Sequence, residues 1–287
     1  MSMASRMAEE DLRYAVRFRA RSPRSGVHVN RVLDGEGAFR DYASFWQAPD
    51  GRGIDIKRSI LDPSGNILVR RFYHAASIGV AVLADLSCSM RPSETDDKLQ
   101  AMARVVAALG RTAERCGDSF TFIGCGEGVL DDWLVLRTRR AGQAEELAER
   151  LRAFRPTARS ARGLVAGAEL IGSVPHLVLL ISDFHLPGEE IEAVLGALAV
   201  HDMVPVVLWS ASEAQAPQGG GMLRLRDSET GRRRLVVLRR ALRERWERAI
   251  ADRRETLRHN FARHGRRPFF ISGAPDFAAL ADHLVAL

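Results

Sequence analysis

Two uninterrupted apolar runs constrain the fold of this chain more than any other feature of its sequence. One spans Ile78–Ala84 and the other Leu177–Ile181, and neither contains a charged residue. Strands that are covered on both faces read as continuous apolar runs, so both segments are predicted to be buried strands. Each run leads directly into polar residues, which places polar side chains at the carboxyl ends of the two strands.

From Ile78 onward, apolar runs alternate with amphipathic stretches. The clearest amphipathic stretch is 98–116, where apolar residues recur on one helical face. This alternation predicts an α/β fold with a doubly wound, mostly parallel sheet and crossover helices. Further helices are expected at 143–154, 162–171, 189–200 and 276–286, and further strands at 119–124, 133–137, 204–209 and 268–271.

Two segments depart from this alternation. Residues 1–75 mix turn residues with single aromatics, which indicates an N-terminal extended arm or small β module packed beside a sheet domain at 76–287. A flexible link is expected at 210–221, since it contains Pro217 and three consecutive glycines. A β-hairpin insertion is expected after it, at about 222–238, with Gly231 in its turn.

Arginine supplies almost all of the positive charge of the chain. There are 42 Lys and Arg residues against 36 Asp and Glu, a formal net charge of +6. This balance permits acidic partners, nucleic acid included, without establishing one. The most basic segment, 239–267, has an apolar stripe at helical spacing with arginines on its other faces, and we interpret it as a solvated helix. A nucleic-acid-binding protein that uses this helix is an alternative.

Composition and apolar patterning indicate an ordinary soluble protein. The apolar content is 46% and the charged content 27%. No apolar stretch approaches the ~20 residues that a membrane span needs, and residues 1–20 lack the apolar core of a secretory signal. The three cysteines, Cys88, Cys116 and Cys125, show no CxxC spacing. We therefore expect a cytoplasmic protein without a membrane span.

The loop after the first buried strand holds three candidate ligand side chains. Asp85, Ser87 and Ser89 follow the run Ile78–Ala84 directly. Open α/β sheets bind their ligands at the carboxyl ends of their strands, which is where these side chains are expected. One carboxylate and two hydroxyls are oxygen ligands that suit a hard divalent cation such as Mg²⁺.

The spacing Asp-x-Ser-x-Ser-Met at 85–90 resembles the metal-ion-dependent adhesion site of von Willebrand factor A (VWA) domains, which have a Rossmann-like fold. The resemblance implies that Asp183 is the strand-end aspartate of the third metal loop. It also asks for a Thr or Ser before a helix in a second loop, where Thr157 and Ser160 are both candidates; the glycines that precede this residue in the family are absent here. The implied site binds Mg²⁺ or another divalent cation through Asp85, Ser87, Ser89, Asp183 and either Ser160 or Thr157.

A narrower resemblance rests on residues ahead of the metal motif and on one turn after it. They are similar to the pattern of a bacterial MoxR-associated VWA subfamily that includes MxaS-type methanol dehydrogenase accessory proteins. The resemblance implies a non-enzymatic accessory factor that acts with a MoxR-type AAA+ ATPase in maturation or metal insertion of a client enzyme such as methanol dehydrogenase. An acidic residue of the partner would complete the metal shell. The residues are Arg40 with Tyr42, Asp50 with Gly51, Arg52 with Ile54 and Asp55, the strand Val69–Phe72, and the turn 227–231.

A metal-dependent phosphoryl-transfer enzyme is the other alternative, with Asp85 as nucleophile. Such motifs place a second Asp two residues on, where this chain has Ser87. The nucleophile elbow, the phosphate-binding loop and the zinc-protease motif are all missing from the sequence. His185 is the only histidine near the expected site, and we interpret it as a supporting or surface residue. No enzymatic activity is expected.

Overall fold

A six-stranded sheet forms the centre of the protein. The computed structural model describes residues 12–18, 25–30, 38–47, 49, 51–91, 98–214, 221–226 and 233–286. The strand order is β11-β8-β7-β4-β5-β6, and every neighbouring pair is parallel except β5 and β6. This confirms the expected mostly parallel α/β fold. The strands are β4 (Gly79–Asp85), β5 (Ser119–Cys125), β6 (Val129–Thr138), β7 (His176–Ser182), β8 (Asp202–Trp209) and β11 (Phe269–Ser272).

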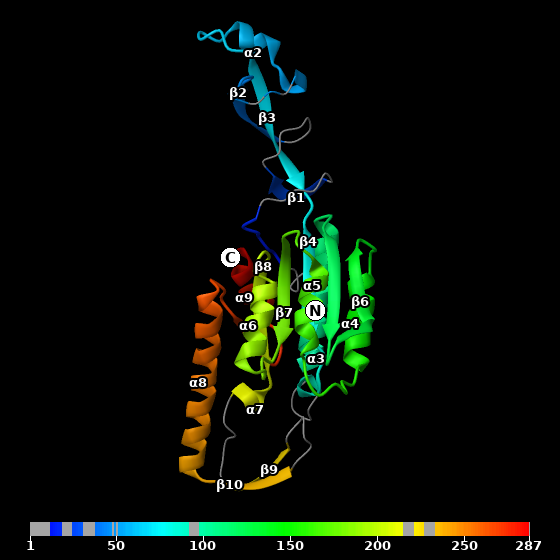
Figure 1. Ribbon diagram of the computed structural model, residues 1–287, viewed down its shortest axis with the longest axis vertical. Helices are drawn as coiled ribbons and strands as arrows, with labels where there is room; N and C mark the ends of the chain where they lie inside the picture. Colours follow the sequence, from blue (N-terminus) through cyan, green and yellow to red (C-terminus); the bar gives the residue numbers. More distant parts are fainter. Residues whose placement is uncertain are drawn as a thin grey trace, which may run out of the picture.

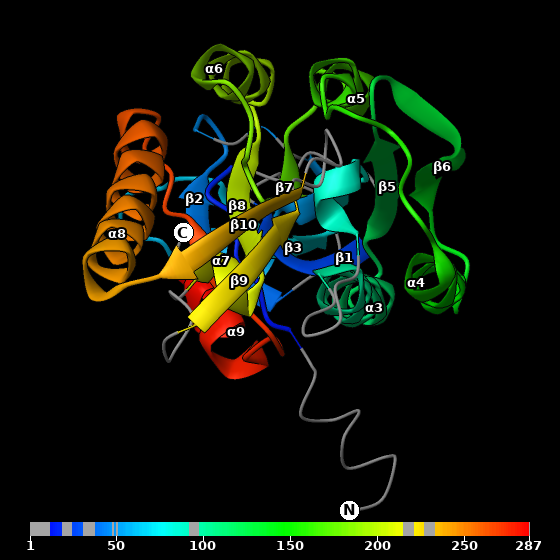
Figure 2. The ribbon, with the colours of Figure 1, turned by 90° about the horizontal axis from the view of Figure 1, so that it is seen from below.

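Helices cover both faces of this sheet (Figure 2). One face carries α3 (Lys98–Arg115), α4 (Gln143–Ala153) and α9 (Phe277–Val285), and the other carries α5 (Gly163–Ile171) and α6 (Gly188–Ala197). The central strands β4 and β7 are mainly apolar because both of their faces are buried; every residue of β7 is buried. None of the described helices is long and apolar enough to cross a bilayer.

The arginine-rich segment forms α8 (Arg240–Arg263) beside the α5 and α6 layer. It meets the core mainly through Leu257 and Phe261, which are fully buried, while Ile250 packs there half-buried. The expected apolar stripe therefore buries only its C-terminal part, while Trp246 is half-buried and Ala249 is exposed.

A second, three-stranded antiparallel sheet precedes the central one. It contains β1 (Ser25–Asn30), β2 (Ala38–Ser44) and β3 (Leu68–Ala76) in the order β1-β3-β2, with η1 (Gly51–Gly53) and α2 (Ile56–Ile60) between β2 and β3. Figure 1 shows it beyond the amino ends of the central strands. The sequence predicted a module beside the sheet; in the structure, β3 leads into β4 through only Ser77 and Ile78.

The residues of the narrower resemblance hold this small sheet together. The Asp55 carboxylate caps α2 by accepting from Arg58 N at 3.0 Å, and it also accepts from the Tyr42 hydroxyl at 3.1 Å and from Arg70 Nε at 2.8 Å. These bonds lower the pKa of Asp55, the Arg58 amide most of all. The side chains of Arg40 and Arg52, and all of Asp50, lie outside the described residues. This part of the motif is thus structural.

The earliest described segment belongs with the central sheet. Leu12 and Tyr14 are buried in its core, and the Tyr14 hydroxyl donates to Asp118 at 2.6 Å. Ala15 N donates to the Leu284 carbonyl at 3.2 Å, which ties the segment to α9. Residues 12–18 therefore pack on the larger body, where Val16 and Phe18 also contact the core.

The insertion between β8 and α8 also differs in part from expectation. The hairpin is confirmed as β9 (Gly221–Arg226) paired antiparallel with β10 (Arg233–Leu238). Its turn 227–231, with Gly231, lies outside the described residues, as does 215–220 in the link. The link does not begin as an irregular segment but as a short helix, α7 (Ala211–Ala214). Glu213 in that helix stabilises it by accepting from Ser210 N at 2.7 Å.

Candidate functional site

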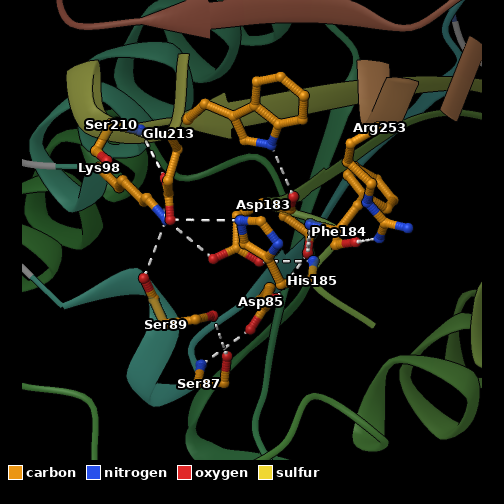
Figure 3. A network of polar contacts seen from close by, with 12 residues as sticks. Asp85, Ser87, Ser89, Lys98, Asp183, Phe184, His185, Ser210, Glu213 and Arg253 are labelled. Atoms are coloured by element: carbon orange, nitrogen blue, oxygen red, sulfur yellow. Dashed lines mark hydrogen bonds and ion pairs between the residues drawn. The ribbon is translucent and has the colours of Figure 1, made fainter. Parts of the chain in front are cut away.

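The carboxyl ends of β4 and β7 bring two aspartates to the same edge of the sheet. The two strands pair in parallel with Ala84 opposite Ile181. Asp85 is the last residue of β4, and Asp183 follows the last residue of β7. Both are buried, with exposed fractions of 0% and 1%. Figure 3 shows them among the side chains of α3, α7 and the β4–η2 loop.

Asp85 is a buried carboxylate held by neutral donors. One of its oxygens accepts from Ser87 N at 2.9 Å and the other from the Ser182 hydroxyl at 2.7 Å. Burial and the nearby charge of Asp183 raise the pKa of Asp85 to about 6. No described side chain makes an ion pair with Asp85. A cation bound here would offset both the burial and the repulsion.

The hydroxyls of Ser87 and Ser89 lie next to this carboxylate. Their Oγ atoms are 3.0 Å apart across the short helix η2 (Cys88–Met90). In octahedral Mg²⁺ coordination with Mg–O distances of ~2.1 Å, neighbouring oxygens are about 3 Å apart. This pair of hydroxyls, together with a buried carboxylate that has no described ion-pair partner, fits a hard divalent cation.

The loop at 155–162 lies against the same turn. Ser87 forms a β-bridge with Ala158, and Cys88 N donates to the Ala158 carbonyl at 2.7 Å. Within the described residues, neither Thr157 nor Ser160 has a hydroxyl hydrogen bond to Asp85, Ser87, Ser89 or Asp183; Thr157 is exposed and Ser160 half-buried. The structure therefore brings the loop to the site without selecting one of the two hydroxyls.

Glycines outside the loop allow this close approach. A Cβ on Gly126 would lie 2.5 Å from that of Ala158, and a Cβ on Gly163 would lie 2.4 Å from the backbone of Gly128. The β5–β6 turn can therefore pack directly on the loop. The chain lacks glycines ahead of Thr157, yet the loop still reaches Ser87.

Lys98, the first residue of α3, supplies a cation at the other aspartate. Its Nζ donates to Asp183 Oδ2 at 3.0 Å, to the Ser89 carbonyl at 3.1 Å and to the carboxylate of Glu213, whose nearer oxygen is 2.7 Å away. The side chain is only 5% exposed. Burial works to lower the pKa of Lys98, but Asp183 and Glu213 outweigh it and the pKa is raised. The ammonium therefore stays charged.

Glu213 reaches this ammonium from α7. Its Oε1 also lies 3.4 Å from His185 Nε2. Burial works to raise the pKa of Glu213, but His185 and Lys98 hold it at about 2. The same contact with Glu213 raises the pKa of His185. Asp183, His185 and Glu213 could together hold a metal ion, yet two of these three side chains already bind the Lys98 ammonium.

The backbone after Asp183 is braced from two sides. The Asp183 carbonyl accepts from Trp209 Nε1 at 3.1 Å, and the Phe184 carbonyl accepts from the Arg253 guanidinium on α8 (Figure 3). Phe184 has a φ of 55°, an uncommon conformation for a residue with a side chain. Its ring packs against Phe261 with centroids 5.1 Å apart. These contacts keep Asp183 at the sheet edge.

Sequence reasoning missed both Lys98 and Glu213. A usable signal existed for Lys98, because only two of the 42 Lys and Arg residues are lysines, Lys57 and Lys98. A cation at the first position of a helix is also opposed by the helix dipole, which suggests a role outside the helix. No such signal existed for Glu213, because it lies in the segment 210–221, which was predicted to be a flexible link.

Comparison with known proteins places the chain in a family. A family model described as a protein of unknown function, DUF58, matches residues 50–256. A protein of Paracoccus denitrificans described as an uncharacterized protein in the moxR 3' region is 40% identical over 96 residues, which cover 33% of this chain and 90% of that protein.

Two solved structures are similar at low sequence identity. BatB, a conserved hypothetical protein from Bacteroides thetaiotaomicron, is 13% identical with a TM-score of 0.42, covering 72% of this chain and 97% of that one. An aerotolerance-related membrane protein from Bacteroides fragilis, with multiple mutations to serines, is 16% identical with a TM-score of 0.37, covering 71% and 94%. TM-scores this low carry no conclusion about this chain. The family model, in contrast, matches well over half of the sequence, and the protein therefore belongs to the DUF58 family.

Proposed function

We propose that this protein is a non-enzymatic, VWA-like adaptor that binds an acidic side chain of a partner protein through a divalent cation at the carboxyl edge of β4 and β7. Asp85, Ser87 and Ser89 would hold the cation, with Asp183 and the hydroxyl of Thr157 or Ser160 completing the set. The observation that carries the proposal is the buried Asp85 carboxylate, which has no described ion-pair partner and lies beside two hydroxyls 3.0 Å apart.

The charges of the site support a role in binding carboxylates. Lys98 already neutralises part of the charge of Asp183 and Glu213. A divalent cation beside Asp85 would therefore keep a net attraction for an additional anionic ligand. When bound, it supplies a point of positive charge in a poorly hydrated site, where a charge-assisted contact is strong. One acidic residue of the partner could then anchor an interface.

The relative from a moxR region supports a MoxR-type AAA+ ATPase as the partner. The resemblance to MxaS-type accessory proteins suggests that the pair acts on a client enzyme, with methanol dehydrogenase as the model for such a client. Maturation or metal insertion is the reaction class that we propose for this assembly.

The contacts favour binding over phosphoryl transfer. Ser87 stands where phosphoryl-transfer motifs place a second Asp, so Asp85 lacks the carboxylate that such motifs pair with the nucleophile. His185 is engaged with Glu213, which makes it a weak candidate for a general base. The arginines of α8 are also partly committed: Arg254 and Arg258 lie over the Phe270 ring at 4.6 and 5.7 Å, so the helix is less suited to a nucleic-acid groove.

Magnesium titration of the full chain tests the proposal. Calorimetry with MgCl₂ should detect binding to the wild type and none to Asp85→Asn, which keeps the shape of the side chain and removes its charge. The matched control is Asp131→Asn on the exposed side of β6, which should bind like the wild type. Equal binding by Asp85→Asn would place the cation elsewhere.

Capture of the host's MoxR-type ATPase on immobilised protein tests the partner. We expect retention in Mg²⁺ that is lost both in EDTA and with Asp85→Asn. Equal retention in Mg²⁺, in EDTA and with Asp85→Asn would rule out the metal-dependent mechanism. Absence of retention by the wild type in Mg²⁺ would rule out the ATPase as the partner.

A further inference from the structure

Glu213 presents a carboxylate to the site from outside the sheet. It belongs to α7, just ahead of the hairpin insertion, whereas Asp85 and Asp183 come from the strand ends. Its contacts are those that a bound carboxylate would make: an ammonium 2.7 Å away and an imidazole nitrogen 3.4 Å away. Both groups can carry positive charge, and together they recognise a carboxylate more strongly than neutral donors would.

Glu213 and His185 are the more exposed members of this cluster, and Lys98 and Asp183 are its buried members. Lys98 is 5% exposed and Asp183 1%, whereas Glu213 is 28% exposed and His185 41%. Solvent therefore reaches the site on the side of Glu213 and His185. Glu213 can leave the ammonium while Lys98 keeps its bonds to Asp183 and to the Ser89 carbonyl.

The charges left behind would attract another anion. Without Glu213, the buried Lys98 ammonium would face one carboxylate in place of two, and His185 would lose its acidic partner. A buried charge that loses a partner is costly, so an incoming carboxylate is favoured at the vacated position.

We propose that Lys98 and His185 form a receptor for an acidic side chain of a partner protein, and that Glu213 fills this receptor in the free protein. The partner binds by exchanging its carboxylate for that of Glu213. This inference rests on the proposed function in that the partner is acidic, but the exchange itself requires no metal ion.

Acetate is a suitable probe, since it carries the carboxylate and little else. In the Glu213→Ala variant of the full chain, sodium acetate should raise the Tm by several degrees more than sodium chloride at the same concentration, because a ligand that binds only the folded state stabilises it. Wild type, in which Glu213 occupies the receptor, should respond equally to both salts. Glu213→Gln, which fills the position with a neutral amide, should respond less than Glu213→Ala.

Two further variants locate the effect. Glu189→Ala removes an exposed glutamate on α6 and should show no preference for acetate. His185→Gln combined with Glu213→Ala should weaken the acetate response several-fold while leaving Lys98 in place. An equal acetate response in Glu189→Ala and Glu213→Ala, or no acetate-specific response in Glu213→Ala, would overturn the receptor.

Capture of the MoxR-type ATPase in EDTA separates this inference from the proposed function. If the receptor binds that partner, Glu213→Ala should retain several-fold more of it than the wild type, since the internal competitor is gone. Acetate stabilisation without any ATPase capture, in Mg²⁺ as well as in EDTA, supports the receptor and rejects that ATPase as the partner. If Glu213→Ala leaves the capture unchanged and does not respond to acetate, the receptor is rejected. The ATPase then remains the partner in the proposed function.

Discussion

The ammonium of Lys98 lies 2.7 Å from the carboxylate of Glu213 and joins the start of α3 to α7. The same ammonium binds Asp183 at the end of β7, so three elements that are distant in sequence meet at one cation. This arrangement neutralises carboxylates at the edge of the sheet. It leaves the Asp85 end of the site without a described ion-pair partner, which is why we assign the two ends different roles.

Replacing Lys98 should strongly destabilise the protein. Lys98→Met leaves Asp183, 1% exposed, without its ammonium, and breaking one partner of a buried pair costs about 3–5 kcal/mol. Lys98→Arg should recover only part of this, because a planar guanidinium does not replace a compact ammonium. Urea unfolding at pH 7 measures both changes. Lys57→Met, at an exposed position, is the control and should cost little; a similarly small loss for Lys98→Met would show that the pair is not important for stability.

Acid should weaken the fold through His201. This residue is 1% exposed, and burial together with His176 lowers its pKa to about 4 from an ordinary value of 6.5. Between these two values the unfolded chain binds a proton that the folded chain does not. The stabilisation is therefore complete above pH 6.5 and is lost as the pH falls toward 4, by up to about 3 kcal/mol.

The measurement is urea unfolding at pH 7 and pH 5. His201→Gln should lose less stability than the wild type between these two values, although His176, whose pKa is also lowered by burial, keeps part of the dependence. His259→Gln changes an exposed histidine and should follow the wild type. If the pH dependence of His201→Gln equals that of the wild type, the buried histidine is not its source.

Gly79 should not tolerate a methyl group. A Cβ at this position would lie 2.0 Å from the His176 ring on the neighbouring strand, so Gly79→Ala forces β4 and β7 apart and should cost about 1–3 kcal/mol or more. Gly196→Ala is the matched control. It lies in α6 with nothing within 4 Å of its Cβ, and it should stabilise the helix by about 0.5–1 kcal/mol. Thermal unfolding would contradict the close approach if both variants shifted the Tm in the same direction.

Arg253 should matter more than its neighbours on α8. It donates to the Phe184 carbonyl in the loop after Asp183, and Arg253→Ala should cost about 1–2 kcal/mol because that carbonyl loses its donor. The exposed Arg245 on the same helix is the control, and Arg245→Ala should be nearly neutral. Equal stability of the two variants in urea unfolding would mean that α8 does not brace the loop.

Much of the central fold could be predicted because its signals are local. Ile78–Ala84 and Leu177–Ile181 are apolar at every position since both faces of their strands are buried, and they became β4 and β7. Parallel strands end at one edge of a sheet, so the sequence also predicted that Asp85 and Asp183 lie together. The hairpin 221–238 was recognisable from its turn residues and paired as expected.

The small sheet was only partly predictable. Its residues were recognised, but not its place beyond the amino ends of the central strands, because that place depends on the short connection between β3 and β4. Likewise, Leu12 and Tyr14 were grouped with this module by position in the chain. Only the folded structure shows that their side chains belong to the same core as those of α3 and α9.

The sequence by itself determined which segments are buried strands and which residues follow them, and it therefore determined the Asp85, Ser87 and Ser89 end of the candidate site. Only the tertiary structure decided that Lys98 and Glu213, 115 residues apart, form the other end. The physical reason lies in the range of the interactions. Burial of a strand leaves its pattern in consecutive residues, whereas an ion pair between a helix start and a short helix in an expected link forms only after the sheet has brought both to one edge.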